Sequence, residues 1–190
     1  MAFSFPVVEA VRQRRTVYRF RPAPLPDGLL EELLAAARFS PNHKHSEPWR
    51  FVVVRGDALG GLADLRVELQ RERAARDGKP VGNVDALRAE VAEAAAAVYV
   101  LQVAADDPVR RREDYASCAI AAYILQLAAW ERGIGARWNT GQITRGEKVR
   151  GFLGLSEGEE VVCCLLLGYP AEVPADWLHR PVQEVTRYIE

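Results

Sequence analysis

The segment from Glu113 to Arg132 constrains the fold most strongly, because it is apolar on almost every side of the helix that it predicts. A helix of this kind is buried over most of its surface, either inside a domain or against a second chain. Gly133 provides a C-cap, and Arg132 complements the helix dipole. We therefore expect this helix to form a wall of the core and to be a candidate contact between two copies of the chain.

Four segments have the composition of β-strands. Glu160–Gly168 is almost continuously apolar, which is typical of a central strand. Trp49–Arg55 and Val98–Leu101 are rich in aromatic and β-branched residues, and Ala136–Trp138 adds a short strand. We expect these segments to form one sheet.

Helical patterns separate these strands. Amphipathic spacing predicts helices over Pro6–Arg14 and over Leu29–Phe39, the second with Asp27 as N-cap. An exposed, charge-rich helix is expected over Ala58–Arg76, and a short helix ended by Gly154 over Glu147–Leu153. No internal repeat or compositional shift marks a linker. Residues 1–190 are thus expected to form a single domain of the α+β (mixed α/β) class, with a central mixed β-sheet flanked by helices.

The charge balance argues against several classes of partner. The 190 residues carry 25 Lys and Arg against 26 Asp and Glu, whereas binding to nucleic acid or to an anionic membrane requires a surplus of cations. The longest apolar runs, Ala94–Leu101 and Val161–Leu167, are too short to span a bilayer. The N-terminus lacks the pattern of a secretory signal, and the three cysteines are expected to be core residues in a reducing compartment. These features predict a cytoplasmic protein that binds neither nucleic acid nor membrane.

The first candidate site is Arg14-Arg15-Thr16, placed where a helix gives way to extended chain. Guanidinium groups bind phosphate through two parallel hydrogen bonds, and a neighbouring hydroxyl adds a further donor. These residues are a candidate anion clamp for the phosphate of a redox cofactor. The alternative is a solvated cationic helix end, which the helix dipole also favours.

Two further segments are candidates for holding a cofactor ring. The polar loop from Ser40 to Arg50 is bounded by prolines and enters a buried strand, and its alternative is an ordinary surface loop. His43 and His45 lack a carboxylate or thiol partner at metal-ligand spacing, which disfavours a metal site. Glycines flank the short strand within Gly133–Gly141 and permit close approach of a ligand.

Taken in order, these segments resemble the nitroreductase family of flavin-dependent oxidoreductases. The resemblance rests on Arg14–Phe20 (RRTVYRF), the loop Ser40–Phe51 with its Pro-Trp-Arg-Phe ending, the apolar helix running into Gly133-Ile134-Gly135, and the strand ending Leu167–Pro170. It spans nearly the whole chain and is closest to the compact branch of the family. It implies a nitroreductase-type fold and an intertwined homodimer with FMN at the subunit interface.

The family's functional residues map onto matching positions of this sequence. Arg14, Arg15 and Thr16 would bind the FMN phosphate, the Ser40 loop would meet the flavin from the partner chain, and Arg180 would complete the phosphate site. The implied cofactor-binding residues are Arg14, Arg15, Thr16, Tyr18, Ser40, Pro41, Asn42, His43, His45, Trp138, Asn139, Thr140, Gly141 and Arg180.

The resemblance also implies an activity. FMN would take a hydride from NADH or NADPH and pass electrons to a small acceptor such as a nitroaromatic or a quinone, with no catalytic protein side chain required. Three residues depart from the family pattern: Tyr18 replaces a frequent Arg or Lys, His45 replaces Asn, and Glu47 replaces Gln. Because of these departures, a flavin-binding storage or sensor protein without robust turnover is the alternative. An interaction module whose arginines bind an acidic partner is a third hypothesis.

Overall fold

The structure is a computed structural model that describes residues 7–176 and 178–190. The helices are α1 (Val7–Gln13), α2 (Leu29–Ala37), α3 (Asp57–Asp77), α4 (Val84–Ala92), α5 (Pro108–Glu131) and α6 (Glu147–Leu153), with short 3-10 turns η1 (His43–His45), η2 (Gln142–Thr144) and η3 (Val182–Val185). The strands are β1 (Phe20–Arg21), β2 (Trp49–Arg55), β3 (Ala96–Val103), β4 (Gly135–Asn139) and β5 (Glu159–Pro170).

The five strands form one sheet in the order β1-β5-β3-β2, with β4 also paired to β5. All four ladders between them are antiparallel, and a parallel pairing is present in the isolated bridge between Thr16 and Ala136. The α+β class is confirmed, and the parallel component of the expected mixed sheet is this bridge. Strand β5 is central, as its apolar run predicted, since it pairs with both β3 and β4.

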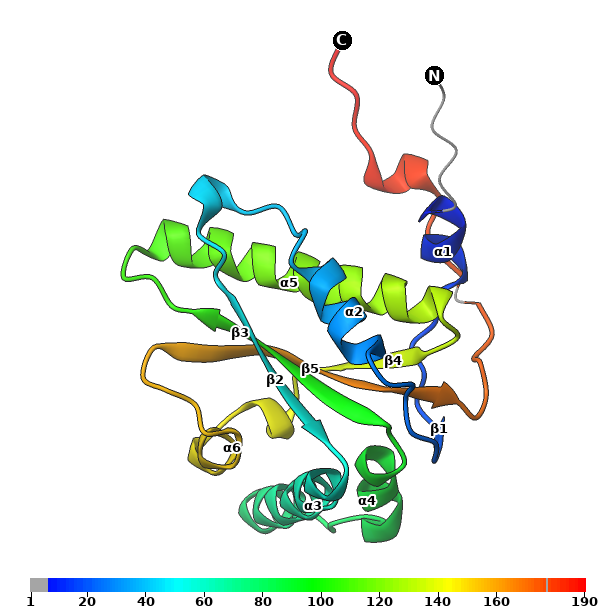
Figure 1. Ribbon diagram of the computed structural model, residues 1–190, viewed down its shortest axis with the longest axis vertical. Helices are drawn as coiled ribbons and strands as arrows, with labels where there is room; N and C mark the ends of the chain where they lie inside the picture. Colours follow the sequence, from blue (N-terminus) through cyan, green and yellow to red (C-terminus); the bar gives the residue numbers. More distant parts are fainter. Residues whose placement is uncertain (1–6, 177) are drawn as a thin grey trace.

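Helices cover both faces of the sheet. Figure 1 shows α2 and α5 on one face and α3, α4 and α6 on the other. Alternate residues of the central strands enter the two cores: Cys163 packs towards α5, whereas Cys164 packs towards α3 and α6. The period of two along a strand explains this division, because it directs the side chains of adjacent residues such as Cys163 and Cys164 to opposite faces.

Two helix starts differ from the sequence prediction. Gly28, with φ of 77°, is the N-cap of α2 instead of Asp27, and it makes no side-chain cap hydrogen bond. Helix α5 begins at Pro108 instead of Glu113 because the Asp107 side chain accepts hydrogen bonds of 2.8 Å from the N–H groups of Val109 and Arg110. The apolar pattern missed this polar first turn.

Helix α5 is buried along one side within this chain. Cys118, Ala122 and Leu125 are fully buried, whereas Tyr115 is 46% exposed and Ile120 is 40% exposed. The expectation of burial on most sides is therefore only half met by the chain itself. An apolar stripe of α5 is left exposed to solvent, and burial against a second chain is the alternative for it. Among the described residues, no helix is long and apolar enough to cross a membrane.

Candidate functional site

The arginine cluster lines a pocket of about 690 Å³ between α1, α5 and the C-terminal tail. Arg14, Arg15, Thr16 and Tyr18 all contribute to its wall, which joins four of the predicted site residues in one place. The complete lining is Val11, Arg12, Arg14, Arg15, Thr16, Tyr18, Tyr123, Pro174, Ala175, Asp176 and His179. We call this hollow the clamp pocket.

Backbone pairing holds the clamp residues in place. The N–H of Val17 donates to the carbonyl of Ala136 over 3.0 Å, and Thr16 bridges the same residue of β4. The Val17 side chain is fully buried beneath the pocket. Because side chains alternate along extended backbone, Thr16 and Tyr18 are directed to the other side from Val17, towards the pocket.

Arg14 has an unused donor in this pocket. Its guanidinium carbon lies 5.7 Å from the centroid of the Tyr123 ring on α5. Its Nε atom is buried and has no hydrogen-bond partner within residues 7–176 and 178–190. An unsatisfied buried donor costs about 1–3 kcal/mol, so the Arg14 guanidinium is incompletely paired by the described residues.

Arg15 already binds a carboxylate. Its Nη1 donates to the backbone carbonyls of Arg12 and Arg14, at 2.6 and 3.0 Å, which fixes the guanidinium. Its Nη2 lies 2.8 Å from Oδ1 of Asp176 in the tail. The Asp176 carboxylate thus occupies part of the Arg15 guanidinium, so this arginine already binds an anionic oxygen.

Tyr18 forms part of a charged cluster that the sequence did not indicate. The Arg137 guanidinium carbon of β4 lies 5.3 Å from the Tyr18 ring centroid. Arg137 also pairs with Glu90 of α4 over 2.9 Å, and Arg66 of α3 pairs with the same carboxylate oxygen. The one sequence signal for this cluster was the alternation of side chains along β4, which directs Arg137 and Trp138 to opposite faces.

The Ser40 loop lies apart from the clamp pocket. The Ser40 hydroxyl is buried and donates to the carbonyl of Ser117 over 2.6 Å, and Asn42 Oδ1 accepts from the N–H of Glu47 over 3.0 Å. Pro41, His43 and His45 are exposed. None of these five predicted residues lines the clamp pocket.

The backbone of this loop is strained. Lys44, His45 and Glu47 have φ values of 53°, 53° and 42°, in the left-handed region that costs a non-glycine residue free energy. Strain of this kind persists where surrounding structure enforces it, and it is concentrated at functional sites. The conformation is therefore consistent with a ligand-contacting loop.

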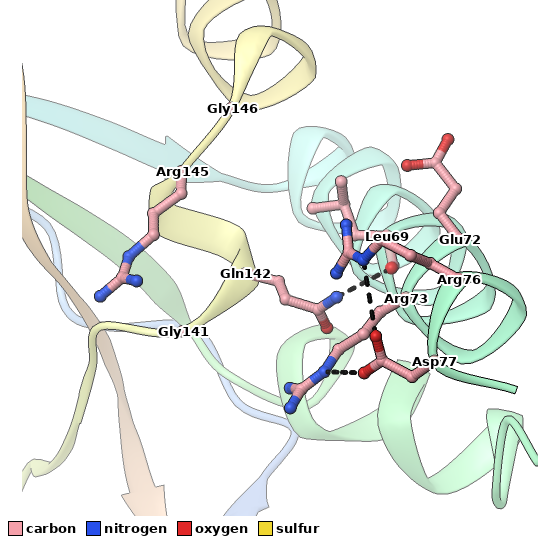
Figure 2. A pocket seen from close by; sticks show the side chains of 9 residues that line it. All are labelled: Leu69, Glu72, Arg73, Arg76, Asp77, Gly141, Gln142, Arg145 and Gly146. Carbon is pink, nitrogen blue, oxygen red and sulfur yellow. Dashed lines mark hydrogen bonds and ion pairs between the residues drawn. The ribbon is translucent and has the colours of Figure 1, made fainter. Parts of the chain in front are cut away.

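The segment after β4 leads to a second pocket, of about 620 Å³. Trp138 and Asn139 end the strand, Thr140 is exposed, and Gly141 lines this pocket between α3 and η2. Figure 2 shows Arg73 and Arg76 both directed at Asp77, at 3.4 and 3.5 Å.

The charge of this second pocket is partly compensated. Asp77 is shared by two arginines, and Gln142 Nε2 is bound to the carbonyl of Leu69 over 2.9 Å. Arg145 points away from Asp77 (Figure 2). The predicted residue Gly141 therefore lies in a different hollow from Arg14 and Arg15.

Arg180 lies in the exposed tail and does not line the clamp pocket, where His179 is found instead. His179 and Tyr123 were not predicted from the sequence. His179 reaches the cluster only because the tail returns to α1, and Tyr123 only because α5 packs against α1. The proximity of the tail to α1 is visible in Figure 1. These two residues join Arg14 and Arg15 around the pocket.

The thiols of the core are not nucleophiles. Burial raises the pKa of Cys118 to about 12 and that of Cys164 to about 12, from 9.0. Both groups are therefore neutral near pH 7, and a thiol must ionise to attack. The arginines gathered at the clamp pocket have the charge and the donors to hold an anionic group.

Comparison with known proteins agrees with this description. The model of the nitroreductase family matches residues 11–169. The Bacillus subtilis protein YfhC, whose name places it among NAD(P)H nitroreductases, is 26% identical over 189 residues, covering 93% of this chain and 90% of its own.

Solved structures agree as well. A nitroreductase-like family protein from Bacillus cereus superposes with a TM-score of 0.85 at 29% identity, covering 100% of this chain and 99% of its own. The FMN-dependent nitroreductase NfnB of Mycobacterium smegmatis, solved with NADPH, shares the fold with a TM-score of 0.76 at 19% identity, covering 97% and 98% of the two chains. The chain belongs to the nitroreductase family.

Proposed function

We propose that this protein is an FMN-dependent oxidoreductase that takes hydride from NADH or NADPH and delivers electrons to a small acceptor such as a nitroaromatic or a quinone. The observation that carries the proposal is the convergence of Arg14, Arg15 and Thr16 on one pocket, where Arg14 keeps a buried donor unpaired. Family membership and the FMN and NADPH complexes named for structural neighbours support it.

The clamp residues match a phosphate in chemistry. Arg14 and Arg15 would hold the FMN phosphate by charge-assisted hydrogen bonds, and the Thr16 hydroxyl would add a donor. Asp176 already places a carboxylate on Arg15, so the site accepts an anionic oxygen. Displacing that carboxylate is the local change that phosphate binding requires.

Bound FMN supplies the redox chemistry, the exchange of hydride and electrons with nicotinamide and acceptor. The chain would supply binding and orientation: the clamp would hold the phosphate end, with Tyr18 beside it on the pocket wall. No protein acid, base or nucleophile is needed for this chemistry, and we assign none.

We propose further that two chains form a homodimer and share each site. Ile120 and Tyr115 leave an apolar stripe on α5, and Leu178 and Ile189 of the tail are 93% and 90% exposed. The family resemblance implies that a second copy covering these surfaces brings its Ser40 loop to the flavin. This supports the assignment of Ser40, Pro41, Asn42, His43 and His45 although they lie outside the clamp pocket.

Residues 1–190 are proposed to form one domain, since the two cores share β3 and β5. The cytoplasm is the proposed compartment, on the sequence argument from the three thiols. The electron acceptor is assigned only as a small molecule.

Purification tests the proposal directly. The protein should be yellow, or should bind added FMN, and NADH or NADPH should bleach the flavin absorbance under anaerobic conditions. Arg14→Ala and Arg15→Ala should each weaken FMN binding at least about tenfold, because a charge-assisted hydrogen bond contributes about 1.5–3 kcal/mol. Arg19→Ala is the matched control, since Arg19 is exposed and does not line the pocket.

A colourless protein that takes up no FMN would overturn the proposal, and unchanged FMN content in both arginine variants would favour the acidic-partner module. Flavin that binds but stays oxidised with both nicotinamides would favour the storage or sensor protein instead. Stopped-flow mixing distinguishes that outcome from enzyme turnover.

A further inference from the structure

A positively charged side chain contacts the wall of the clamp pocket from outside the pocket. Tyr18 lines the pocket, and Arg137 lies over its ring at 5.3 Å without lining the pocket itself. A guanidinium at this distance is attracted by the electron density of the ring face. Tyr18 therefore lines the pocket while its ring contacts a cation that is held in place by an ion pair.

The charges behind Tyr18 do not cancel. Arg137 and Arg66 both pair with Glu90, so two cations share one carboxylate. Their side chains are only 19% and 17% exposed, which limits screening by solvent. Arg66 Nε is buried and has no hydrogen-bond partner among the residues that the structure describes. The cluster therefore holds a net positive charge close to the pocket wall.

We propose that Arg137 is a positioning residue that raises the reduction potential of the flavin through Tyr18, and that Glu90 opposes it. This inference rests on the proposed function, because it requires FMN bound with its phosphate in the clamp pocket and its flavin ring beside Tyr18. Arg137 holds the Tyr18 ring and draws electron density from it, which makes the phenol a better hydrogen-bond donor. A reduced flavin ring is more electron-rich than an oxidised one, so a nearby positive potential stabilises the reduced form.

The cluster also has a purely structural explanation. Arg137 and Glu90 join β4 to α4, and an ion pair between elements can simply hold them together. That explanation predicts that losing either partner lowers stability and that neither loss changes the flavin equilibrium in a charge-dependent direction. The electrostatic proposal predicts opposite effects from removing the cation and removing the anion.

The experiment is a spectroelectrochemical titration of the FMN-loaded protein. Arg137→Met should lower the midpoint potential by about 30 mV, which corresponds to a tenfold change in a two-electron equilibrium. Glu90→Gln should raise the potential, because the carboxylate no longer offsets Arg66 and Arg137. Arg137→Lys keeps the charge and should restore most of the wild-type potential.

Arg88→Met is the matched control. Arg88 lies on the same helix α4 as Glu90 and pairs with Asp64 over 2.8 Å, but at the surface, with 49% of its side chain exposed. Its removal should leave the potential unchanged. In a Tyr18→Leu background, the effect of Arg137→Met should shrink, because the ring that relays the charge is gone.

Shifts of the same sign in Arg137→Met and Glu90→Gln, or no shift in either, would overturn the proposal. If Arg137→Met fails to fold, Glu90→Gln still decides the sign: a potential that falls or stays unchanged in this variant would overturn the proposal. A wild-type protein that binds no FMN refutes the proposed function, whereas one that binds FMN with an unchanged potential in the variants refutes only this inference.

Discussion

Arg15 and Asp176 form an ion pair of 2.8 Å that joins the start of the chain to its C-terminal tail. The Arg15 side chain is 20% exposed and that of Asp176 is 65% exposed. The carboxylate therefore approaches a half-buried guanidinium from the solvent side. Asp176 binds the same guanidinium that we propose for the FMN phosphate, so the tail and the cofactor would compete for Arg15.

Asp176→Asn is expected to tighten FMN binding by up to about fivefold. The substitution removes the competing charge, and an exposed ion pair of this kind contributes about 0–1 kcal/mol. Fluorescence titration of the apoprotein measures the effect. Asp77→Asn is the control, since Asp77 pairs with Arg73 and Arg76 in the other pocket. Weaker binding in Asp176→Asn would mean that the contact closes the tail over the cofactor instead of competing with it.

Ile120→Glu is expected to break the dimer and to reduce its FMN content. Ile120 is 40% exposed on the open stripe of α5, and a buried, unpaired carboxylate at an interface costs about 2–5 kcal/mol. The dimer dissociation constant should rise at least about thirtyfold. Sedimentation equilibrium with an absorbance scan of the flavin checks both effects.

Phe152→Glu provides the comparison, because Phe152 has a similar exposure of 38% and lies on α6, across the sheet. It should remain dimeric. A dimer that survives Ile120→Glu would place the interface away from this stripe.

The sequence predicted the helices and strands whose pattern lies within one short stretch of chain. Helix α6 has the expected bounds, and α3 differs by one residue at each end. Glycine marks the ends of both helices, since Gly78 and Gly154 take the left-handed conformation that ends a helix. Strand β5 was recognisable as central because both of its faces are apolar.

Contacts between distant segments were not predictable in the same way. Arg137 meets Glu90 only because β4 and α4 pack near one another, and His179 reaches the clamp pocket only because the tail returns to α1. No spacing of residues along the sequence predicts such contacts. The resemblance to a family pointed to Arg14, Arg15 and Thr16, but placed Arg180 where the structure has His179.

Stability should fall with rising pH above about 9 because of the buried thiols. Burial raises the pKa of Cys118 from 9.0 to about 12. Between these values the unfolded chain releases the thiol proton while the folded chain keeps it, so the unfolded state binds fewer protons and gains stability as pH rises. The contribution is fully present below pH 9 and is lost towards pH 12.

Urea unfolding between pH 9 and 10.5 measures this loss. Cys118→Ala should make the fall in unfolding free energy shallower by up to about 1.4 kcal/mol per pH unit. Comparing the slopes of unfolding free energy against pH removes the pH-independent loss of stability that the smaller side chain causes. Equal slopes in the wild type and the variant would show that Cys118 ionises without unfolding.

Gly135→Ala should destabilise the fold by about 1–3 kcal/mol, because the added methyl has no room. A Cβ atom at Gly135 would lie 2.4 Å from Cγ2 and 2.9 Å from Cβ of Val17. Val17 precedes Tyr18 and follows Thr16, so pushing it outward displaces the clamp residues. We therefore expect Gly135→Ala to weaken FMN binding as well as to lower the urea midpoint.

A double-mutant cycle with Val17→Ala tests the cause. Removing the Val17 methyl groups makes space for the new one, so the double variant should lose less stability than the two single changes added together. Gly151→Ala in α6 is the control, since nothing lies within 4 Å of the position that its added Cβ would take, and a helix gains about 0.5–1 kcal/mol from this change. Strict additivity in the cycle would show that the contact between Val17 and Gly135 does not hold the clamp segment against β4.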